Sequence, residues 1–341
     1  MHKHKRSSYR ENESRIVQGI SQKLWDDLPL LNFVFYAAIF AHAEIANLIP
    51  PRPEYVWSFI FPLIVPFVIY NLRWRSANTS ERWLYTIVLA SAPLLIGLTW
   101  WFAIRIPIAS HSLRQIYEIG AILNLLVLII HAARLRRELV WLLLGPVTFY
   151  GLLLENGGIW LGFFTELNYF IYLGFLPAPL APLCGWITIF YLLIWVKWEI
   201  QKQVSKNLIN PFLAAIFAAF SGLMLDLQID PLATAVGFWI WNPLLQNKVL
   251  GVPILNFVAW FCAIYPFTWL IFHREQMVSL SPLEIAKKSH RHWLLLRVPF
   301  ILAVAAVMFC SMMFLIEGGL SGPTFEILRE SAINFGVFRL Q

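Results

Sequence analysis

The chain alternates between long apolar stretches and short polar segments, and the lengths of the apolar stretches predict membrane-spanning helices. The hydrocarbon core of a bilayer is about 30 Å thick, so a spanning helix needs roughly 20 apolar residues. Nine stretches reach or approach this length: 28–49, 56–72, 83–102, 115–133, 139–154, 180–196, 208–225, 252–272 and 294–316. Because a backbone in lipid must satisfy its own hydrogen bonds, we expect an all-α bundle of about nine spanning helices (eight to ten).

Two further apolar pieces, 159–176 and 232–245, are short or broken by Gly and Pro. We interpret them as re-entrant or interfacial segments. The polar N-terminal segment is too long for the charged part of a cleavable signal peptide. The predicted organisation is a polar cytoplasmic tail (1–27), a single transmembrane domain (28–316) and a C-terminal tail (317–341), with the distinctive motifs in about 150–272.

The basic residues predict the orientation of the chain. Lys and Arg are enriched in cytoplasmic loops, and 20 of the 26 fall in the N-terminal segment and in every second loop. The six on the other side are Arg52, Arg105, Arg114, Lys248, Arg329 and Arg339. We therefore expect a multi-pass protein of the cell membrane (inner or plasma), with its N-terminus in the cytoplasm.

The composition supports a membrane protein and argues against several other classes of protein. Of the 341 residues, 59% are hydrophobic and only 13% charged, against about 25% charged in soluble domains. The net charge of +7 then reflects topology, not a nucleic-acid partner. The sequence has no Gly-rich phosphate loop, no metal-ligand spacing and no common hydrolase nucleophile motif. We expect no cofactor and no metal, and the lipid bilayer as the general partner.

Acidic residues gather on one side of this predicted topology. The stretch LDLQIDPLATAVGFWIW, residues 225–241, places Asp226 and Asp230 four residues apart, on one side of a helix. Glu155 ends another apolar stretch that runs in the same direction. Carboxyl groups inside a membrane protein are costly and usually functional. Two of them in a poorly hydrated site favour retention of a proton, so that one can act as an acid.

Simpler interpretations of these acids stand beside the functional one. Glu155 alone would fit the headgroup zone, and Asp226 would fit an ion pair with Lys248 or with an arginine across the loop. Aromatic side chains surround the acids in sequence and fit either an interfacial belt or an apolar pocket whose ring faces stabilise a cation. They are Trp160, Phe163, Phe164, Tyr169, Tyr172, Trp186, Phe238, Trp239, Trp241, Phe257 and Trp260.

Residues 225–261 resemble the signature of the integral-membrane carotenoid biosynthesis family, which includes carotenoid 1′,2′-hydratases and bisanhydrobacterioruberin hydratases. The resemblance rests on Asp226, Asp230-Pro231, Trp239, Trp241, Gly251-Val252-Pro253, Asn256 and Trp260. A second, weaker match is LLLENGGIWLGFF, residues 152–164, where Glu155, Gly158 and Gly162 fit the family pattern. Leu161 stands where the family usually has threonine, and Glu166 stands near a family glycine.

The resemblance implies addition of water to a terminal isoprenoid double bond of a carotenoid, which gives a tertiary alcohol. Asp226, Asp230 and Glu155 would share the acid and water-orienting roles. Asn256 would orient the water, and Trp239, Trp241, Trp260 and Tyr169 would line the pocket for the long isoprenoid substrate.

Two other functions remain open from the sequence. A membrane prenyltransferase or lycopene elongase would use Asp-x-x-x-Asp to hold a magnesium pyrophosphate, but this chain lacks a second Asp-rich motif. A carrier or transporter of a hydrophobic molecule would use the acids for binding or gating. Dependence on magnesium would indicate the first, and transport without chemical change the second.

Overall fold

The described part of the chain covers most of the predicted helices. The structure is a computed structural model, and it describes residues 22–23, 25–32, 55–74, 77–79, 81–83, 85–87, 90, 94, 110–135, 137–166, 169–203, 210–235, 237–277 and 288–334. Most of the predicted spans 28–49 and 83–102, and most of the predicted N-terminal tail, lie outside the described residues. The number of nine spans therefore stays a prediction.

Within the described ranges, six helical segments are long and apolar enough to cross a membrane. They are α5 (Ser110–Leu135), the α6–α7 segment over Leu139–Trp160, α8 (Leu180–Gln203), α9 (Pro211–Ala235), α10 (Ile254–Met277) and α13 (Val298–Glu317). Each corresponds to one predicted stretch, and the stretch 56–72 forms the further helix α3 (Tyr55–Trp74). The chain is thus a multi-pass helical membrane protein, as predicted.

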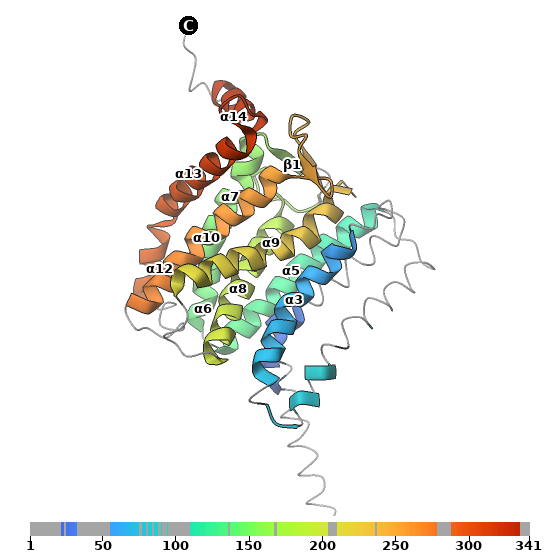
Figure 1. The fold of residues 1–341 in the computed structure, drawn as a ribbon, viewed down its shortest axis with the longest axis vertical. Coiled ribbons are helices and arrows are strands. Elements are labelled where there is room, and N and C mark those ends of the chain that lie inside the picture. The colour runs from blue at the N-terminus through green and yellow to red at the C-terminus, as the bar shows by residue number, and fades with distance from the viewer. Residues whose placement is uncertain are drawn as a thin grey trace, which may run out of the picture.

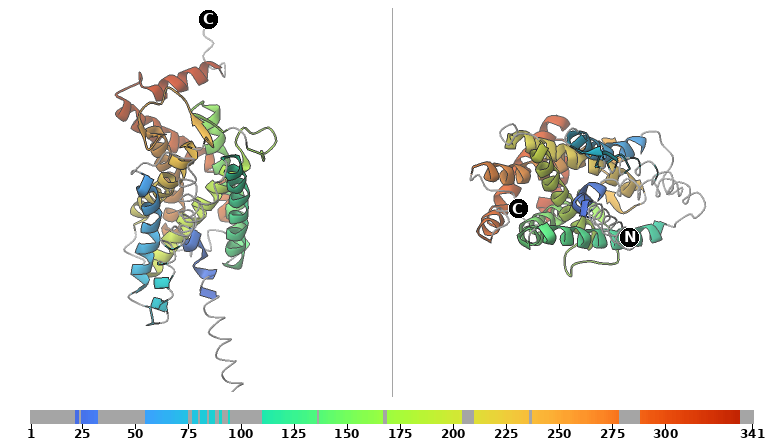
Figure 2. Two further views of the ribbon diagram at one scale, coloured as in Figure 1. Left: turned by 90° about the vertical axis from the view of Figure 1, so that its right-hand side faces the viewer. Right: turned by 90° about the horizontal axis from the view of Figure 1, so that it is seen from below.

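Helix α8 occupies the centre of the bundle. It contacts α3, α5, α7 and α9, and α10 lies between α9 and α13. Nearly all of α8 is buried, whereas α13 leaves Phe300, Val307 and Leu315 exposed. Large exposed apolar side chains are expected where a helix faces lipid. Figures 1 and 2 show the long helices side by side, with the strands and α14 gathered at one end of the bundle, hereafter the strand end.

The span over Leu139–Trp160 is built from three pieces, α6 (Arg137–Leu142), the π-helix η2 (Leu143–Val147) and α7 (Thr148–Trp160). Pro146 lies inside the π-helix. Because proline has no N–H to donate to the preceding turn, an α-helix would leave a carbonyl unpaired there. The π-helix ends at Thr148, whose backbone N–H and hydroxyl both donate to the carbonyl of Leu143, the hydroxyl at 2.8 Å.

Short strands modify the all-α prediction at the strand end. β1 (Phe164–Glu166) pairs antiparallel with β2 (Trp239–Trp241), with Phe164 opposite Trp241 and Glu166 opposite Trp239. The two pieces that were predicted as separate re-entrant or interfacial segments thus meet in one sheet. This sheet ties the end of α7 to the end of α9, and the Trp241 indole N–H donates to Thr234 Oγ1 at 2.9 Å.

A tight hairpin leads into α10. β3 (Lys248–Val249) pairs with β4 (Val252–Pro253), and the two turn residues, Leu250 and Gly251, both have positive φ angles of 54° and 83°. This is the geometry of a type I′ turn, in which glycine relieves the strain of one left-handed position. Because α10 begins directly after β4, Asn256 falls in its first turn.

The opposite end of α8 carries a buried ion-pair network. Arg73 of α3 forms ion pairs with Asp27 and Glu199, and Glu199 also pairs with Lys202. The side chains of Arg73, Asp27 and Glu199 are at most 11% exposed, whereas Lys202 is 66% exposed. A buried charge is tolerated when it is paired, so Arg73 connects the N-terminal part of the chain to the central helix.

The predicted C-terminal tail contains a helix. A short helix, α12 (Lys288–Leu295), precedes α13, and α14 (Pro323–Asn334) follows it and packs against it. Residues of α14 reach the strand end: the Ser331 hydroxyl donates to the carbonyl of Leu161 at 2.6 Å. Part of the predicted tail therefore covers the end of α7.

Candidate functional site

A largely apolar cavity of about 340 Å³ lies at the strand end and extends between α10 and α13. Its wall comes from α5, α7, α8, α9, α10, α13, α14 and the two strands β1 and β2. Glu155, Asp230 and Asn256 are the side chains in this wall with carboxyl or amide groups. No Lys or Arg is among the described residues that line it.

Asn256 joins the two aspartates of α9. Its side-chain amide donates to Asp230 Oδ2 at 2.5 Å and to Asp226 Oδ2 at 3.0 Å. Asp230 and Asn256 reach the cavity, but Asp226 is 0% exposed and lies behind them, outside the lining. The spacing of four residues on α9 and the first turn of α10 therefore build one hydrogen-bonded unit. Lys248, considered above as a partner for Asp226, is exposed on β3.

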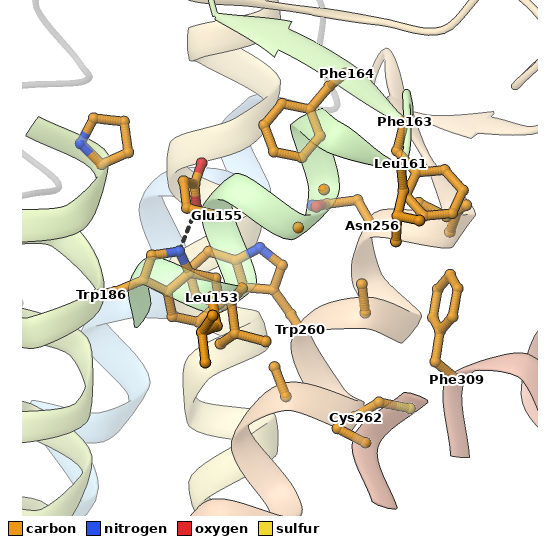
Figure 3. A pocket seen from close by; sticks show the side chains of 18 of the residues that line it. Leu153, Glu155, Leu161, Phe163, Phe164, Trp186, Asn256, Trp260, Cys262 and Phe309 are labelled. Atoms are coloured by element: carbon orange, nitrogen blue, oxygen red, sulfur yellow. Dashed lines mark hydrogen bonds between the residues drawn. The ribbon is translucent and has the colours of Figure 1, made fainter. Parts of the chain in front are cut away.

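Glu155 approaches the cavity from the last turns of α7. The indole N–H of Trp186, on α8, donates a hydrogen bond to Glu155 Oε2 (Figure 3). The Trp186 ring stacks on Trp260 of α10, with ring centroids 4.7 Å apart. Glu155 is thus held at the edge of a pair of stacked indoles. Oε2 accepts this bond, and a carboxylate has further lone pairs with which it can accept a proton.

Aromatic rings form the wall around the acids. Phe164 packs against Trp241, with ring centroids 5.3 Å apart, and Phe163 packs edge-on against Phe309 of α13 at 5.9 Å. Figure 3 shows Phe163, Phe164 and Phe309 on one side of the cavity and the stacked Trp186 and Trp260 on the other. Aromatic faces attract cations, so this cavity can stabilise a positive charge that forms on an apolar ligand.

The end of α7 turns sharply to deliver Phe163 and Phe164 to this wall. The Phe163 N–H bonds the carbonyl of Gly158 at 3.0 Å, and the Gly162 N–H bonds that of Ile159 at 2.9 Å. Gly162 has a φ of +78°, which is the glycine position of a Schellman-type helix end. The two glycines of the weaker sequence match therefore have structural roles.

Gly158 and Gly157 offer a matched test of this turn. A methyl group on Gly158 would lie 2.4 Å from Phe164 Cε1, whereas one on Gly157 would meet nothing within 4 Å. We expect Gly158→Ala to lower the free energy of unfolding by about 1–3 kcal/mol through overpacking. Gly157→Ala should raise it by up to about 1 kcal/mol, since alanine favours a helix. Unfolding of the detergent-solubilised variants measures both, and an equal effect of the two substitutions would contradict the close packing.

The structure brings together most of the residues that the sequence singled out. Six of the eight candidates line the cavity: Glu155, Asp230, Trp239, Trp241, Asn256 and Trp260. Asp226 lies behind Asp230, as described. Tyr169 also lies outside the lining; it packs against Tyr117 and Phe238, with ring centroids 6.4 and 6.2 Å apart. Tyr117, the ring neighbour of Tyr169, does line the cavity.

Sequence reasoning missed two contributors to this site. Trp186 was noted only as one aromatic residue among many, and its bond to Glu155 depends on the crossing of α7 and α8. Glu166 was noted only as a departure from the family pattern, yet it is 4% exposed and lies at the strand end. Glu166 stands two residues after Phe164, but this spacing places the two side chains on one face only if the segment is known to be a strand.

The arrangement can be compared with known proteins. A family model described as carotenoid biosynthesis protein matches residues 116–325. The chain belongs to this family. The match to the carotenoid biosynthesis family covers well over half of the chain, and it includes every residue that lines the cavity except Leu328. No curated protein and no solved structure is significantly similar to the chain.

Proposed function

We propose that this protein adds water to a terminal isoprenoid double bond of a carotenoid and so forms a tertiary alcohol. The observation that carries the proposal is the placement of Asp230 and Glu155 in one aromatic-walled cavity without a lining Lys or Arg. An apolar alkene can enter such a cavity, and protonation of an alkene requires an acid that is shielded from water. Membership of the carotenoid biosynthesis family supports the class of substrate.

Asp230 is the proposed acid. It shares the amide group of Asn256 with Asp226, and repulsion between two adjacent carboxylates is relieved when the pair holds one proton. Asp230 gives this proton to the less substituted carbon of the double bond, and the other carbon becomes a tertiary cation. Asp226 acts through Asp230 as a positioning residue, since it does not reach the cavity.

Glu155 is the proposed acceptor in the second step. The tertiary cation lies against aromatic faces, where the Trp186 and Trp260 rings stabilise its charge. A water molecule attacks the cation through its oxygen and forms the new carbon–oxygen bond, while one of its protons passes to Glu155. The product is the tertiary alcohol. The less substituted carbon has gained one hydrogen, and the tertiary carbon has gained one hydroxyl group.

Pigment analysis tests this function. The chain would be expressed in a host that accumulates lycopene or a fifty-carbon relative, and pigments would be separated and weighed by liquid chromatography and mass spectrometry. We expect a more polar pigment that is heavier by one or two molecules of water. Unchanged pigments, in membranes that demonstrably contain the protein, would refute hydration of that carotenoid.

The same assay separates the other two functions. A prenyltransferase or elongase would lengthen the carotenoid, and its activity would require magnesium. The absence of a lining Lys or Arg gives a pyrophosphate no basic partner among the described residues of the cavity. A carrier would move the carotenoid and leave its mass unchanged.

A further inference from the structure

Strand geometry turns the side chain of Glu166 toward the interior of the strand end. Along β1, Phe164 and Glu166 point to one face and Thr165 to the other, because side chains alternate on a strand. Thr165 is exposed, and so is Ile240, which lies opposite it on β2. Phe164 lines the cavity, and Glu166 is therefore on the cavity side of the sheet.

The buried carboxyl group of Glu166 has acidic neighbours. No N–H group among the described residues donates a hydrogen bond to either of its oxygens, and its strongest electrostatic partner is the carboxyl group of Glu155. Its electrostatic neighbours are the carboxyl groups of Glu155 on α7 and Asp230 on α9, and the hydroxyl of Tyr169 is also within electrostatic reach. Burial, and next the nearby carboxyl group of Glu155, raise the pKa of Glu166 well above its ordinary value.

The proposed reaction ends with a proton on Glu155 that Asp230 needs for the next turnover. Each hydration removes a proton from Asp230 and deposits a proton on Glu155, so a second turnover requires its transfer back. Both groups lie in the cavity wall, and Asp230 is only 4% exposed. Glu166 interacts electrostatically with both, and a carboxyl group can accept a proton on one oxygen and release one from the other.

We infer that Glu166 is a proton-relay residue that returns the proton from Glu155 to Asp230 between turnovers. This inference rests on the proposed hydration. Glu166 donates its own proton to Asp230 and takes the proton of Glu155, so the three carboxyl groups regain their starting protonation. Glu166 does not touch the alkene, and the first turnover does not need it.

Comparison of single and multiple turnover tests the relay. Purified protein in lipid vesicles would be mixed with the carotenoid that the pigment assay identifies, first with protein in excess and then with carotenoid in excess. We expect Glu166→Gln to keep its single-turnover rate within about twofold, while its steady-state rate falls roughly 100-fold. Glu166→Asp should recover part of the steady-state rate, because it restores a carboxyl group.

Other outcomes would overturn the relay. An equal loss in both regimes would place Glu166 in the chemical step or in folding, and no loss in either would remove it from the cycle. Thr165→Val serves as the control, since it alters the exposed face of the same strand, and its two rates should match those of the unaltered protein. Failure of the unaltered protein to hydrate in both regimes would refute the proposed function itself.

Discussion

Asp230→Asn is expected to reduce carotenoid hydration by at least about 100-fold while the protein still inserts into the membrane. The asparagine keeps the size of the side chain, and its carbonyl oxygen can still accept the hydrogen bond that Asn256 donates at 2.5 Å. It cannot give a proton to an alkene. Chromatography and mass spectrometry would measure the amount of hydrated carotenoid formed per unit of membrane-inserted protein.

Two further substitutions sharpen this result. Asp226→Asn should cost less than Asp230→Asn, because Asp226 lies behind the cavity wall and acts only through its neighbour. Lys248→Gln, at an exposed position on β3, should leave the rate unchanged. Substantial hydration by the Asp230→Asn protein would show that another group supplies the proton.

Arg73→Met is expected to lower the free energy of unfolding by about 3–5 kcal/mol, the usual cost of a buried ion pair that loses one partner. The substitution leaves the carboxyl groups of Asp27 and Glu199 buried without their arginine. It lies at the far end of α8 from the cavity. Unfolding of the purified protein in mixed detergent micelles would measure the change.

The second ion pair of Glu199, with Lys202, provides a control for this measurement. Lys202 pairs with the same carboxyl group but is 66% exposed, so Lys202→Met should cost less than about 1 kcal/mol. Adding Glu199→Gln to Arg73→Met should recover part of the loss, because one uncompensated charge is removed. Equal effects of Arg73→Met and Lys202→Met would show that burial of the network contributes little.

The helices could be predicted because their signal is local. Each apolar stretch is long enough to span a bilayer, whatever its neighbours are, and six of them form spanning helices in the described chain. The ends of the helices were harder to predict from the sequence. The stretch that was predicted to end at 225 continues as α9 to Ala235, and Asn256 of another helix donates hydrogen bonds to Asp226 and Asp230, which lie in this extension.

The strands could not be predicted because their signal is not local. β1 has three residues, and its partner β2 begins more than 70 residues later in the chain. Nothing in FTE or WIW marks this pairing. For the same reason, hydropathy could place Glu155 and Asp230 at one end of the bundle but could not show that Glu166 faces them, or that Trp186 is the hydrogen-bond donor to Glu155.

The size of the cavity has a consequence for carotenoids with two reactive ends. About 340 Å³ is near the lower limit for a pocket that encloses a drug-sized ligand, so under the proposed function it would hold one end group while the polyene stays in the bilayer. A symmetrical substrate must then leave, reverse and re-enter before its second end reacts. Hydration would be distributive: the singly hydrated pigment accumulates before the doubly hydrated one, and the end group rather than the overall length decides which carotenoids are accepted.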